Sequence, residues 1–368
     1  MRIVHVIARF NQGGTAGWLK VLIDGQRLEG NEVILLSGMV QANEIEDGRF
    51  PILGGSHIPG LGRSISIIAD LKVFWTLRTL LIEIKPDVIN THTAKAGLIG
   101  RLAARSIFKN RIAVVHTFHG HILYGYFGRI KTRIFVQLER ILSGLTDVIL
   151  VSGLTVKNEL LSKKIGREEQ YVVIRPGVPP VVTHSQSVIR QKLSISEKQI
   201  VIGWLGRLTD IKRPDRVLEI AKLLPNFIFL LGGDGELLES IRQKAPKNVI
   251  LVGWTTPVDI WSASDIALLT SANEAQPISL VEAASAGLPL IGEDVGSVSE
   301  VIQNTVNGYL THNLDSRIKA IEKLASDSEL RERMGEAAKK AAVELFGVDQ
   351  FLTTHRLAYE KAVQIRNK

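Results

Sequence analysis

The hydrophobic pattern alternates between two kinds of segment along the chain. Short runs rich in Val and Ile are separated by longer segments in which apolar residues recur at helical spacing. Uninterrupted apolar runs of this length are typical of parallel strands that helices cover on both faces. In the first half, the pattern predicts strands over 2–9, 32–38, 86–93, 111–120, 147–153 and 171–177, and helices over 16–28 and 94–108.

The alternation stops once and then resumes. Residues 175–187 read RPGVPPVVTHSQS, and three prolines among small polar residues indicate a linker. We therefore expect an α/β protein with one domain over 1–183, a second over 184–350, and a cleft between them. The strands predicted for the second domain are 199–208, 226–236, 248–254, 264–271 and 288–294.

The last segment, 351–368, has the spacing of an amphipathic helix. Its apolar positions are Phe351, Leu352, Leu357 and Ala362. We interpret it as a packing helix, and we expect it to return to the first domain.

Composition narrows the class of protein. A length of 368 residues fits two domains, and a hydrophobic content of 45% is that of a globular protein. The sequence has no apolar run of 18 residues and no signal-peptide cleavage pattern, so the expected location is the cytoplasm. The absence of cysteine excludes disulfides, thiol nucleophiles and zinc–cysteine sites.

Charge is distributed unevenly between the two predicted domains. Residues 1–183 contain 23 Lys and Arg against 14 Asp and Glu, whereas the remainder contains 22 against 23. This asymmetry indicates an anionic partner for the first domain, either a phosphorylated substrate or a phospholipid surface, or else a merely solvated basic face. Nucleic acid is disfavoured because no recognised binding motif accompanies the charge.

The segment 121–142 combines this charge with aromatic residues in an amphipathic pattern. Such a segment can lie on an anionic bilayer, where it would also suit a polyprenyl-diphosphate-linked acceptor, or it can be a core helix with a solvated basic face. The residues that carry the acceptor or membrane interpretation are Tyr124, Tyr126, Arg129, Lys131 and Arg133.

Three predicted strand-to-helix loops carry candidate phosphate ligands. Glycine in such a loop lets the backbone approach a ligand, and free amides at a helix start favour phosphate, although tight turns also need glycine. Arg207 and Lys212 follow a buried strand and precede a helix, where cations can neutralise a diphosphate or be ordinary charges of a solvated loop. None of the loops has the spacing of the dinucleotide fingerprint. The glycines of these loops are Gly13, Gly14, Gly206, Gly233 and Gly235.

A fourth loop contains two carboxylates. Glu274 follows the strand over 264–271, and a helix is predicted to begin near Pro277 and to end at Gly287. Glu282 then lies in the second turn of that helix. Amides of the loop and of the first helical turn are candidate donors to phosphate oxygens, and the two carboxylates are suited to sugar hydroxyls.

Taken together, these motifs resemble the retaining, nucleotide-sugar-dependent glycosyltransferases of family 4, also called glycosyl transferases group 1. The motifs are the two glutamates with seven intervening residues, GRLTDIK at 206–212, GGDGEL at 232–237, HTFHGH at 116–121 and the first Gly-Gly loop. The resemblance covers essentially the whole chain in order. It implies the GT-B fold, in which two Rossmann-like parallel α/β domains face each other across a cleft.

The resemblance also implies roles for individual residues. Arg207 and Lys212 would stabilise the departing nucleoside diphosphate, Glu274 would contact the transferred sugar, and Glu282 would contact the ribose. His119 would lie near the reacting sugar carbon, donating to a sugar hydroxyl or stabilising the charged transition state. The implied catalytic residues are His119, Arg207, Lys212 and Glu274; the implied donor-binding residues are Gly13, Gly14, Gly206, Arg207, Lys212, Gly233, Gly235, Glu274, Ala275, Gln276, Pro277, Ile278 and Glu282.

Two features refine this expectation. Ala275 and Gln276 replace the glycine and the aromatic or small residue common in the family, which leaves the identity of the donor sugar open. Two cations plus helix amides can replace a metal, and the sequence has no Asp-x-Asp pair, so we expect no metal and no other cofactor.

The expected activity is transfer of a hexose or N-acetylhexosamine, with retention, from a nucleotide sugar, with a UDP-sugar favoured. The expected acceptor is a lipid-linked glycan in surface polysaccharide, lipopolysaccharide or capsule assembly, with the enzyme peripheral on the inner face of the plasma membrane. Two alternatives stay open: a nucleotide-sugar epimerase of the same fold, and a non-catalytic homologue that binds a partner. A dehydrogenase is disfavoured by the missing dinucleotide fingerprint.

Overall fold

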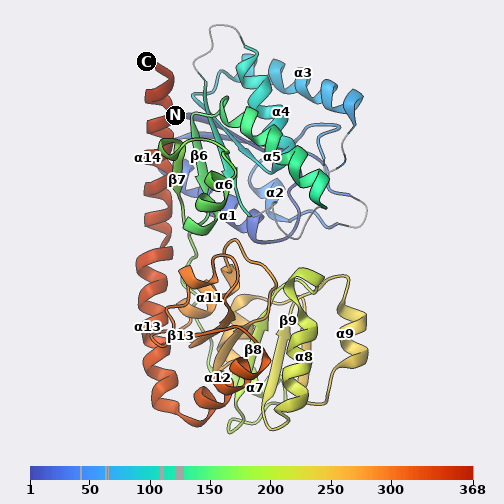
Figure 1. The fold of residues 1–368 in the computed structure, drawn as a ribbon, viewed down its shortest axis with the longest axis vertical. Coiled ribbons are helices and arrows are strands. Elements are labelled where there is room, and N and C mark those ends of the chain that lie inside the picture. Colours follow the sequence, from blue (N-terminus) through green and yellow to red (C-terminus); the bar gives the residue numbers. More distant parts are fainter. Residues whose placement is uncertain (42–43, 63, 65, 108–111, 121–127, 368) are drawn as a thin grey trace. The chain divides into compact units, whose positions relative to one another are not determined.

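The computed structural model describes residues 1–41, 44–62, 64, 66–107, 112–120 and 128–367. These residues form two compact units (Figure 1). Unit 1 comprises Met1–Gly177 and Val348–Lys368, and unit 2 comprises Val178–Gly347. Each unit is a parallel sheet with helices on both faces, which confirms the α/β prediction. The first passage between units falls inside the segment predicted as a linker.

Unit 1 is built on a parallel sheet with the strand order β3-β2-β1-β4-β5-β6-β7. Ile3 of β1 pairs with Val33 of β2 on one side and with Val88 of β4 on the other. The strands are β1 (Arg2–Ile7), β2 (Glu32–Ser37), β3 (Ser56–His57), β4 (Val88–His92), β5 (Ala113–Phe118), β6 (Val148–Val151) and β7 (Tyr171–Val173).

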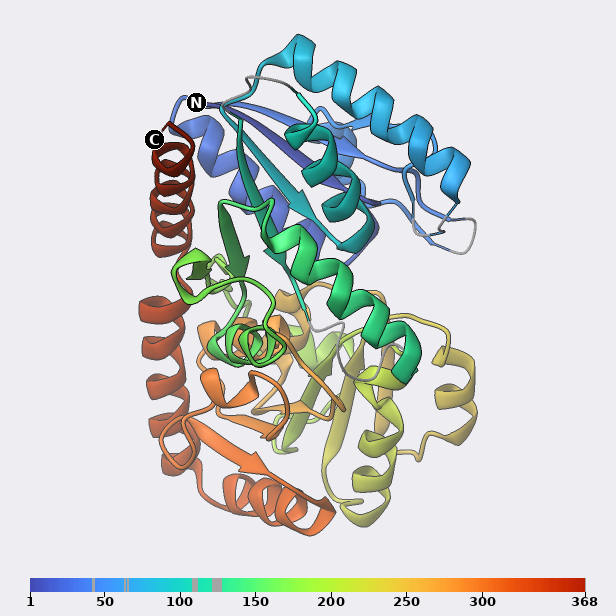
Figure 2. The ribbon, with the colours of Figure 1, turned by 45° about the horizontal axis from the view of Figure 1, so that its top comes forward.

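Alternate residues of these strands bury against different helices. Ile3 packs in a cluster with residues of α1 and α14, whereas Val4 packs with residues of α3 and α4. Figures 1 and 2 show α3, α4 and α5 in succession along one face of the sheet. The helices are α1 (Gly14–Leu28), α2 (Arg49–Ile52), α3 (Ile67–Ile84), α4 (Ala94–Arg105), α5 (Arg129–Ser143), α6 (Leu154–Ser162), the 3-10 helix η1 (Glu168–Gln170) and α14 (Val348–Asn367).

Unit 2 is also built on a parallel sheet, with the strand order β10-β9-β8-β11-β12-β13. Its strands are β8 (Val201–Leu205), β9 (Ile228–Gly232), β10 (Val249–Gly253), β11 (Ile266–Leu269), β12 (Leu290–Glu293) and β13 (Gly308–Thr311). Its helices are α7 (Gln186–Lys192), η2 (Asp210–Lys212), α8 (Pro214–Leu223), α9 (Leu238–Lys244), α10 (Pro257–Ala263), α11 (Ile278–Ser285), η3 (Val298–Glu300), α12 (Leu314–Ser326) and α13 (Ser328–Phe346).

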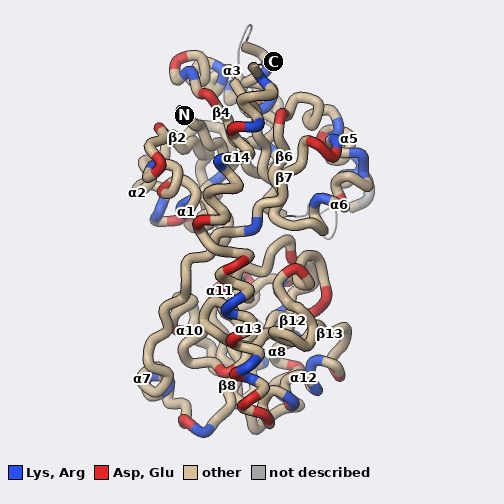
Figure 3. Tube along the Cα trace, turned by 90° about the vertical axis from the view of Figure 1, so that its left-hand side faces the viewer, with Lys and Arg blue, Asp and Glu red and all other residues tan. Residues whose placement is uncertain are grey.

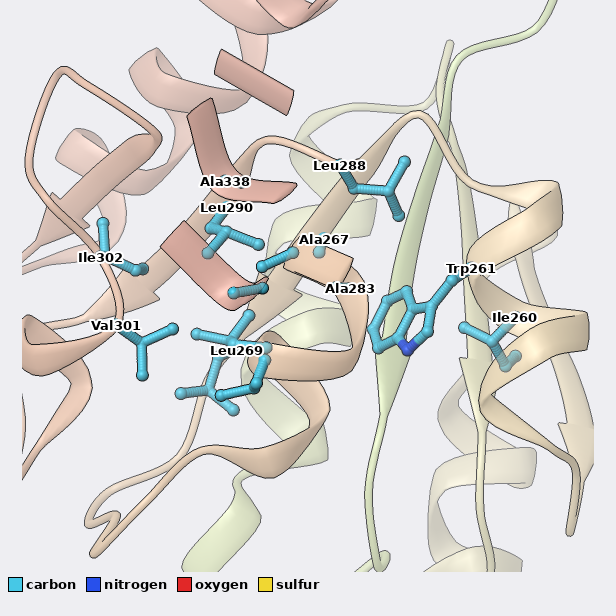
Figure 4. Close-up of a cluster of buried hydrophobic side chains, with 14 of the residues drawn as sticks. Ile260, Trp261, Ala267, Leu269, Ala283, Leu288, Leu290, Val301, Ile302 and Ala338 are labelled. Atoms are coloured by element: carbon cyan, nitrogen blue, oxygen red, sulfur yellow. The ribbon is translucent and has the colours of Figure 1, made fainter. Parts of the chain in front are cut away.

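The core on one face of this second sheet holds α11 in place. Figure 4 shows Leu269 of β11 and Leu290 of β12 packed with Ala283 of α11 and Ala338 of α13. Small residues on α11 let α13 approach it closely, and burial of this apolar surface fixes the helix that carries Glu282. α11 therefore presents its N-terminal loop from a rigid support.

Three details differ from the sequence prediction or add to it. The short strand β3 and the last strand β13 were not predicted. Leu357 is 56% exposed, so its predicted packing role is wrong; Phe351, Ala358, Tyr359 and Ala362 bury α14 against unit 1 instead. Among the helices of the described residues, none combines the length and apolar character that crossing a bilayer requires.

Candidate active site

In unit 2, the loops that follow β8 and β9 are fastened to each other through their backbones. The amide of Leu208 donates to the carbonyl oxygen of Asp234 at 2.9 Å, and that of Leu237 donates to the carbonyl of Leu208 at 3.0 Å. These bonds bring Gly206 and Arg207 next to the glycine turn after β9. Both loops leave the carboxyl ends of adjacent parallel strands, where ligands bind in open α/β sheets.

Two glycines permit this close approach. Gly233 has φ of 135°, and a Cβ there would lie 1.9 Å from the carbonyl oxygen of Gly206. Gly235 has φ of 154°, and its Cβ would lie 2.5 Å from the carbonyl oxygen of Leu208. Any side chain would both strain the backbone and collide with backbone atoms, so these positions require glycine.

The loop between β11 and α11 is anchored to η2. The hydroxyl of Thr270 lies 3.1 Å from the carbonyl oxygen of Lys212 and accepts from the indole N–H of Trp204 at 3.0 Å. The amide of Ala272 donates to the carbonyl of Ile211 at 2.8 Å. As a result, the two segments predicted to hold the cation and the first carboxylate are fixed against one another.

Lys212 and Glu274 form the central contact of this arrangement. Lys212 Nζ lies 2.6 Å from Glu274 Oε1, and the hydroxyl of Ser271 donates to the same oxygen at 2.6 Å. The carboxylate is buried, with a side-chain exposure of 7%, whereas the lysine side chain is 26% exposed. The ion pair therefore orients the carboxylate while leaving N–H donors of the lysine for another ligand.

Further groups surround the start of α11. Within the described residues, the backbone amides of Ala275 and Gln276 have no hydrogen-bond acceptor. The side-chain amide of Gln276 is buried, and neither of its polar atoms has a partner there. Pro277 directly precedes the helix, and Ile278 is its first residue, so the helix begins within one residue of the predicted position.

Glu282 lies in the second turn of α11, as predicted, and is half-buried. Burial raises the pKa of its carboxyl from 4.5 to about 7. Among the described residues, no hydrogen bond or ion pair offsets this cost. A carboxylate held in this state is suited to accept hydrogen bonds from a ligand's hydroxyl groups.

In unit 1, the predicted residues are brought together around the start of α1. Gly13 precedes the helix with φ of 146°, and Gly14 is its first residue. Trp18, one turn further on, contacts the ring of His119 edge-on, with centroids 5.1 Å apart. His119 follows β5, is half-buried, and its Nε2 lies 2.8 Å from Nδ1 of His92.

For the other predicted residues that the structure describes, it shows no side-chain contact with the groups described above. Arg207 is exposed and forms no ion pair with a described residue. Lys131 and Arg133 are exposed on α5, and Arg129 is the first residue of that helix. Tyr124 and Tyr126 lie outside the described residues. A separate pocket in unit 2, between α8 and α9, is lined by none of the predicted site residues.

Sequence reasoning missed several supporting residues. Ser271 and Thr270, which fix Glu274 and η2, are small polar residues without a distinctive pattern. His5 and His92 are fully buried behind His119. Their signal was available, because a histidine inside an apolar strand indicates a buried polar network.

Two units, each a parallel sheet with interleaved helices, are the architecture of GT-B glycosyltransferases. The model described as glycosyl transferases group 1 matches residues 185–341, and that described as Glycosyltransferase Family 4 matches residues 12–181. The chain belongs to glycosyltransferase family 4.

Known proteins support this assignment. The chain is 30% identical, over 74% of its length and 75% of the relative's, to the UDP-Gal:alpha-D-GlcNAc-diphosphoundecaprenol alpha-1,3-galactosyltransferase of Escherichia coli. It is 27% identical to the O-antigen biosynthesis glycosyltransferase WbnH of Escherichia coli, over 92% of this chain and 95% of the relative. Among solved structures, Anabaena Alr3699/HepE in complex with UDP superposes with a TM-score of 0.80 at 20% identity, covering 97% of this chain and 99% of that one.

Proposed function

We propose that the protein transfers a hexose or N-acetylhexosamine, with retention of configuration, from a UDP-sugar to a polyprenyl-diphosphate-linked glycan. The observation that carries the proposal is the Lys212–Glu274 ion pair on the loops after β8 and β11. It sets a cation and an oriented carboxylate beside the free amides that precede α11. This combination suits a sugar diphosphate, because the cation meets phosphate and the carboxylate meets hydroxyls.

Leaving-group stabilisation is the main catalytic task in this proposal. Negative charge develops on the diphosphate as the sugar bond breaks, and preorganised cations and amides aimed at that charge lower the barrier. Lys212 supplies a fixed charge, Arg207 an exposed and adaptable one, and Ala275 and Gln276 supply N–H donors. On this basis we propose that the reaction needs no metal ion.

The acceptor proposal is supported by the named relatives. The Escherichia coli galactosyltransferase acts, by its name, on an acceptor in which GlcNAc is linked through diphosphate to undecaprenol. WbnH belongs, by its name, to O-antigen biosynthesis. An acceptor of this class is anionic and lipid-anchored, which agrees with the basic first domain. We place the protein in surface polysaccharide assembly.

A lipid-anchored acceptor calls for an enzyme at the membrane surface, and α5 has the features for it. Ile130, Ile134 and Ile141 are exposed on this helix, and so are Lys131 and Arg133 beside them in sequence. Figure 3 shows Lys and Arg, in blue, on α5. Exposed apolar residues bracketed by cations are the pattern of helices that lie in an anionic interface. We propose that α5 contributes to peripheral binding at the inner face of the plasma membrane.

The inner side of α5 explains why its apolar residues can face outward. Glu139 of α5 is buried and forms an ion pair with Arg101 of α4, whose Nη2 lies 2.8 and 2.9 Å from the two carboxylate oxygens. This contact anchors the helix to unit 1 without using the exposed isoleucines. Cosedimentation with phosphatidylglycerol vesicles, compared with phosphatidylcholine vesicles, tests the proposal. Ile134→Asn should weaken binding to the phosphatidylglycerol vesicles. Val343→Asn, at an exposed apolar position of unit 2, should leave that binding unchanged.

The transferase proposal is tested by donor turnover. Purified protein with EDTA is supplied with UDP-galactose, UDP-glucose or UDP-N-acetylglucosamine and with GlcNAc-diphosphoundecaprenol, and UDP and the glycan product are followed. One donor should give a product with the donor's anomeric configuration. Lys212→Ala should abolish formation of this product. Lys222→Ala, which replaces an exposed lysine of α8, should leave it unchanged.

Other outcomes of the same assay refute parts of the proposal. An epimerised UDP-sugar without UDP release identifies the epimerase alternative. No turnover and no binding of any nucleotide sugar identifies the non-catalytic alternative. Turnover that appears only when a divalent ion is added refutes the metal-independent mechanism, and a product of inverted configuration refutes retention.

A further inference from the structure

Three histidines of unit 1 form a row across three neighbouring strands. His5 lies on β1, His92 ends β4, and His119 directly follows β5. The rings of His5 and His92 are stacked with centroids 5.3 Å apart, and those of His92 and His119 lie 5.0 Å apart. The row leads from the interior of the sheet to the predicted active-site histidine.

Each neighbouring pair in the row shares one hydrogen bond. His5 Nδ1 lies 3.0 Å from His92 Nε2, and His92 Nδ1 lies 2.8 Å from His119 Nε2. The inner end of the row is closed by Gln26 of α1, whose Oε1 lies 2.9 Å from His5 Nε2. At the outer end, His119 Nδ1 makes no hydrogen bond to a described residue. Within the described part of the chain, the row therefore has one fixed end and one open end.

All three rings are neutral at physiological pH. Burial lowers the pKa of His5 to about 4 and that of His119 to about 3, and it lowers the pKa of His92 well below its ordinary value. Among the described residues, no carboxylate pairs with any of the three. A neutral imidazole carries one N–H, so each nitrogen–nitrogen contact contains a single proton, and the tautomer of one ring dictates that of the next.

The order of protons follows from the closed end. A carbonyl oxygen can only accept, so His5 Nε2–H donates to Gln26 Oε1 and His5 Nδ1 is left without a proton. His92 Nε2–H then donates to His5 Nδ1, and His119 Nε2–H donates to His92 Nδ1. His119 Nδ1 is consequently unprotonated.

We propose that Gln26, His5 and His92 are positioning residues that hold His119 in its Nε2–H tautomer, so that His119 Nδ1 accepts a hydrogen bond from a hydroxyl of the transferred sugar. The proposal rests on the proposed function, since it assigns a contact to the sugar of the donor. It reverses one of the roles expected for His119, that of a donor to a sugar hydroxyl. Trp18, which meets the ring edge-on, fixes its plane.

Ring-nitrogen NMR of the full chain labelled with 15N-histidine tests the tautomer directly. His119 is assigned by the signals lost in His119→Asn. The wild-type protein should show His119 protonated on Nε2 alone at neutral pH. A proton on Nδ1 instead, or an even mixture, overturns the proposal without any need for a variant or an activity.

Gln26→Met tests whether the row sets that tautomer. It keeps the length of the side chain but removes the terminal acceptor, so His119 should show both tautomers. The kcat for UDP release should fall about tenfold, as for the loss of one transition-state hydrogen bond, with KM unchanged. Gln170→Met is the matched control, because Gln170 is also buried in unit 1 and its amide donates to the carbonyls of Ser143 and Thr146 instead. Equal effects of the two variants overturn the proposal.

Ligand titrations of the labelled protein test the contact with sugar. UDP alone should leave the His119 Nδ1 resonance in place, whereas UDP-galactose, UDP-glucose or UDP-N-acetylglucosamine should move it. If a UDP-sugar binds and turns over without moving this resonance, the sugar contact is refuted. If no UDP-sugar binds or turns over, the proposed function fails and the sugar contact fails with it, while the tautomer measurement still decides the proton order.

Discussion

Replacing Glu282 with Gln should stabilise the protein at alkaline pH. The substitution keeps the shape of the side chain and removes its charge. Glu282 is half-buried on α11, and within the described residues nothing compensates its carboxylate. Desolvation disfavours the charged form, so the native state resists ionisation more strongly than the unfolded chain does.

The size of the effect follows from the pKa. Burial raises it from 4.5 to about 7. Each pKa unit corresponds to about 1.4 kcal/mol, so the ionised carboxylate costs about 3 kcal/mol of unfolding free energy at pH 8. Because the native pKa is the higher one, this cost is absent below pH 4.5, grows between pH 4.5 and 7, and is complete above 7.

Urea unfolding at pH 4.5 and pH 8 measures the difference. A background of Trp18→Phe and Trp75→Phe confines the fluorescence to the three tryptophans of unit 2, which carries Glu282. At pH 8, Glu282→Gln should raise the unfolding free energy by about 3 kcal/mol, and at pH 4.5 the gain should nearly vanish. Glu322→Gln, on the exposed side of α12, should change little at either pH.

Two results would contradict the predicted effect of Glu282→Gln. Equal stability of wild type and Glu282→Gln at pH 8 would show that the carboxylate is solvated in the native protein. A gain of the same size at both pH values would show that the effect is not due to ionisation. In either case Glu282 would not hold an uncompensated charge ready for a ligand.

Three further predictions concern the fold around the site, each measured as a change in unfolding free energy. Gly233→Ala should cost more than about 2 kcal/mol, because the added Cβ would lie 1.9 Å from a backbone oxygen. Gly48→Ala, where the added Cβ would enter open space, should cost less than about 1 kcal/mol. Glu139→Leu should cost about 3–5 kcal/mol by leaving the buried guanidinium of Arg101 unpaired, and Arg101→Met should restore most of that loss in the double variant. Asp327→Ala should cost about 1 kcal/mol, because its side chain caps α13.

Much of the fold could be predicted because parallel strands buried on both faces leave an unmistakable pattern. The Val- and Ile-rich runs identified every strand except β3 and β13. β3 has two exposed residues, Ser56 and His57, and no pattern can form over that length. β13 begins at Gly308 and contains one apolar run too short to stand out.

The candidate site was predictable only in part, for a different physical reason. Lys212 and Glu274 were found because they lie in loops that follow buried strands and match motifs of family 4, and the structure brings them into contact. A histidine inside an apolar strand does indicate a buried polar group, but the row itself was not found, because sequence spacing does not reveal which strands are neighbours. His5 and His92 meet only because β1 pairs with β4, although β2 and β3 separate them along the chain.

The position of α14 has a consequence for how the chain folds during synthesis. Phe351 and Tyr359 complete the core of unit 1, and the phenol of Tyr359 accepts from Asn90 of β4 at 2.7 Å. Domains are usually finished in the order in which the ribosome makes them. Here unit 2 is continuous and can close first, whereas the sheet of unit 1 waits for residues 348–367 to emerge. The part synthesised first is thus the last to be completed, and one face of its sheet lacks the cover of α14 until then.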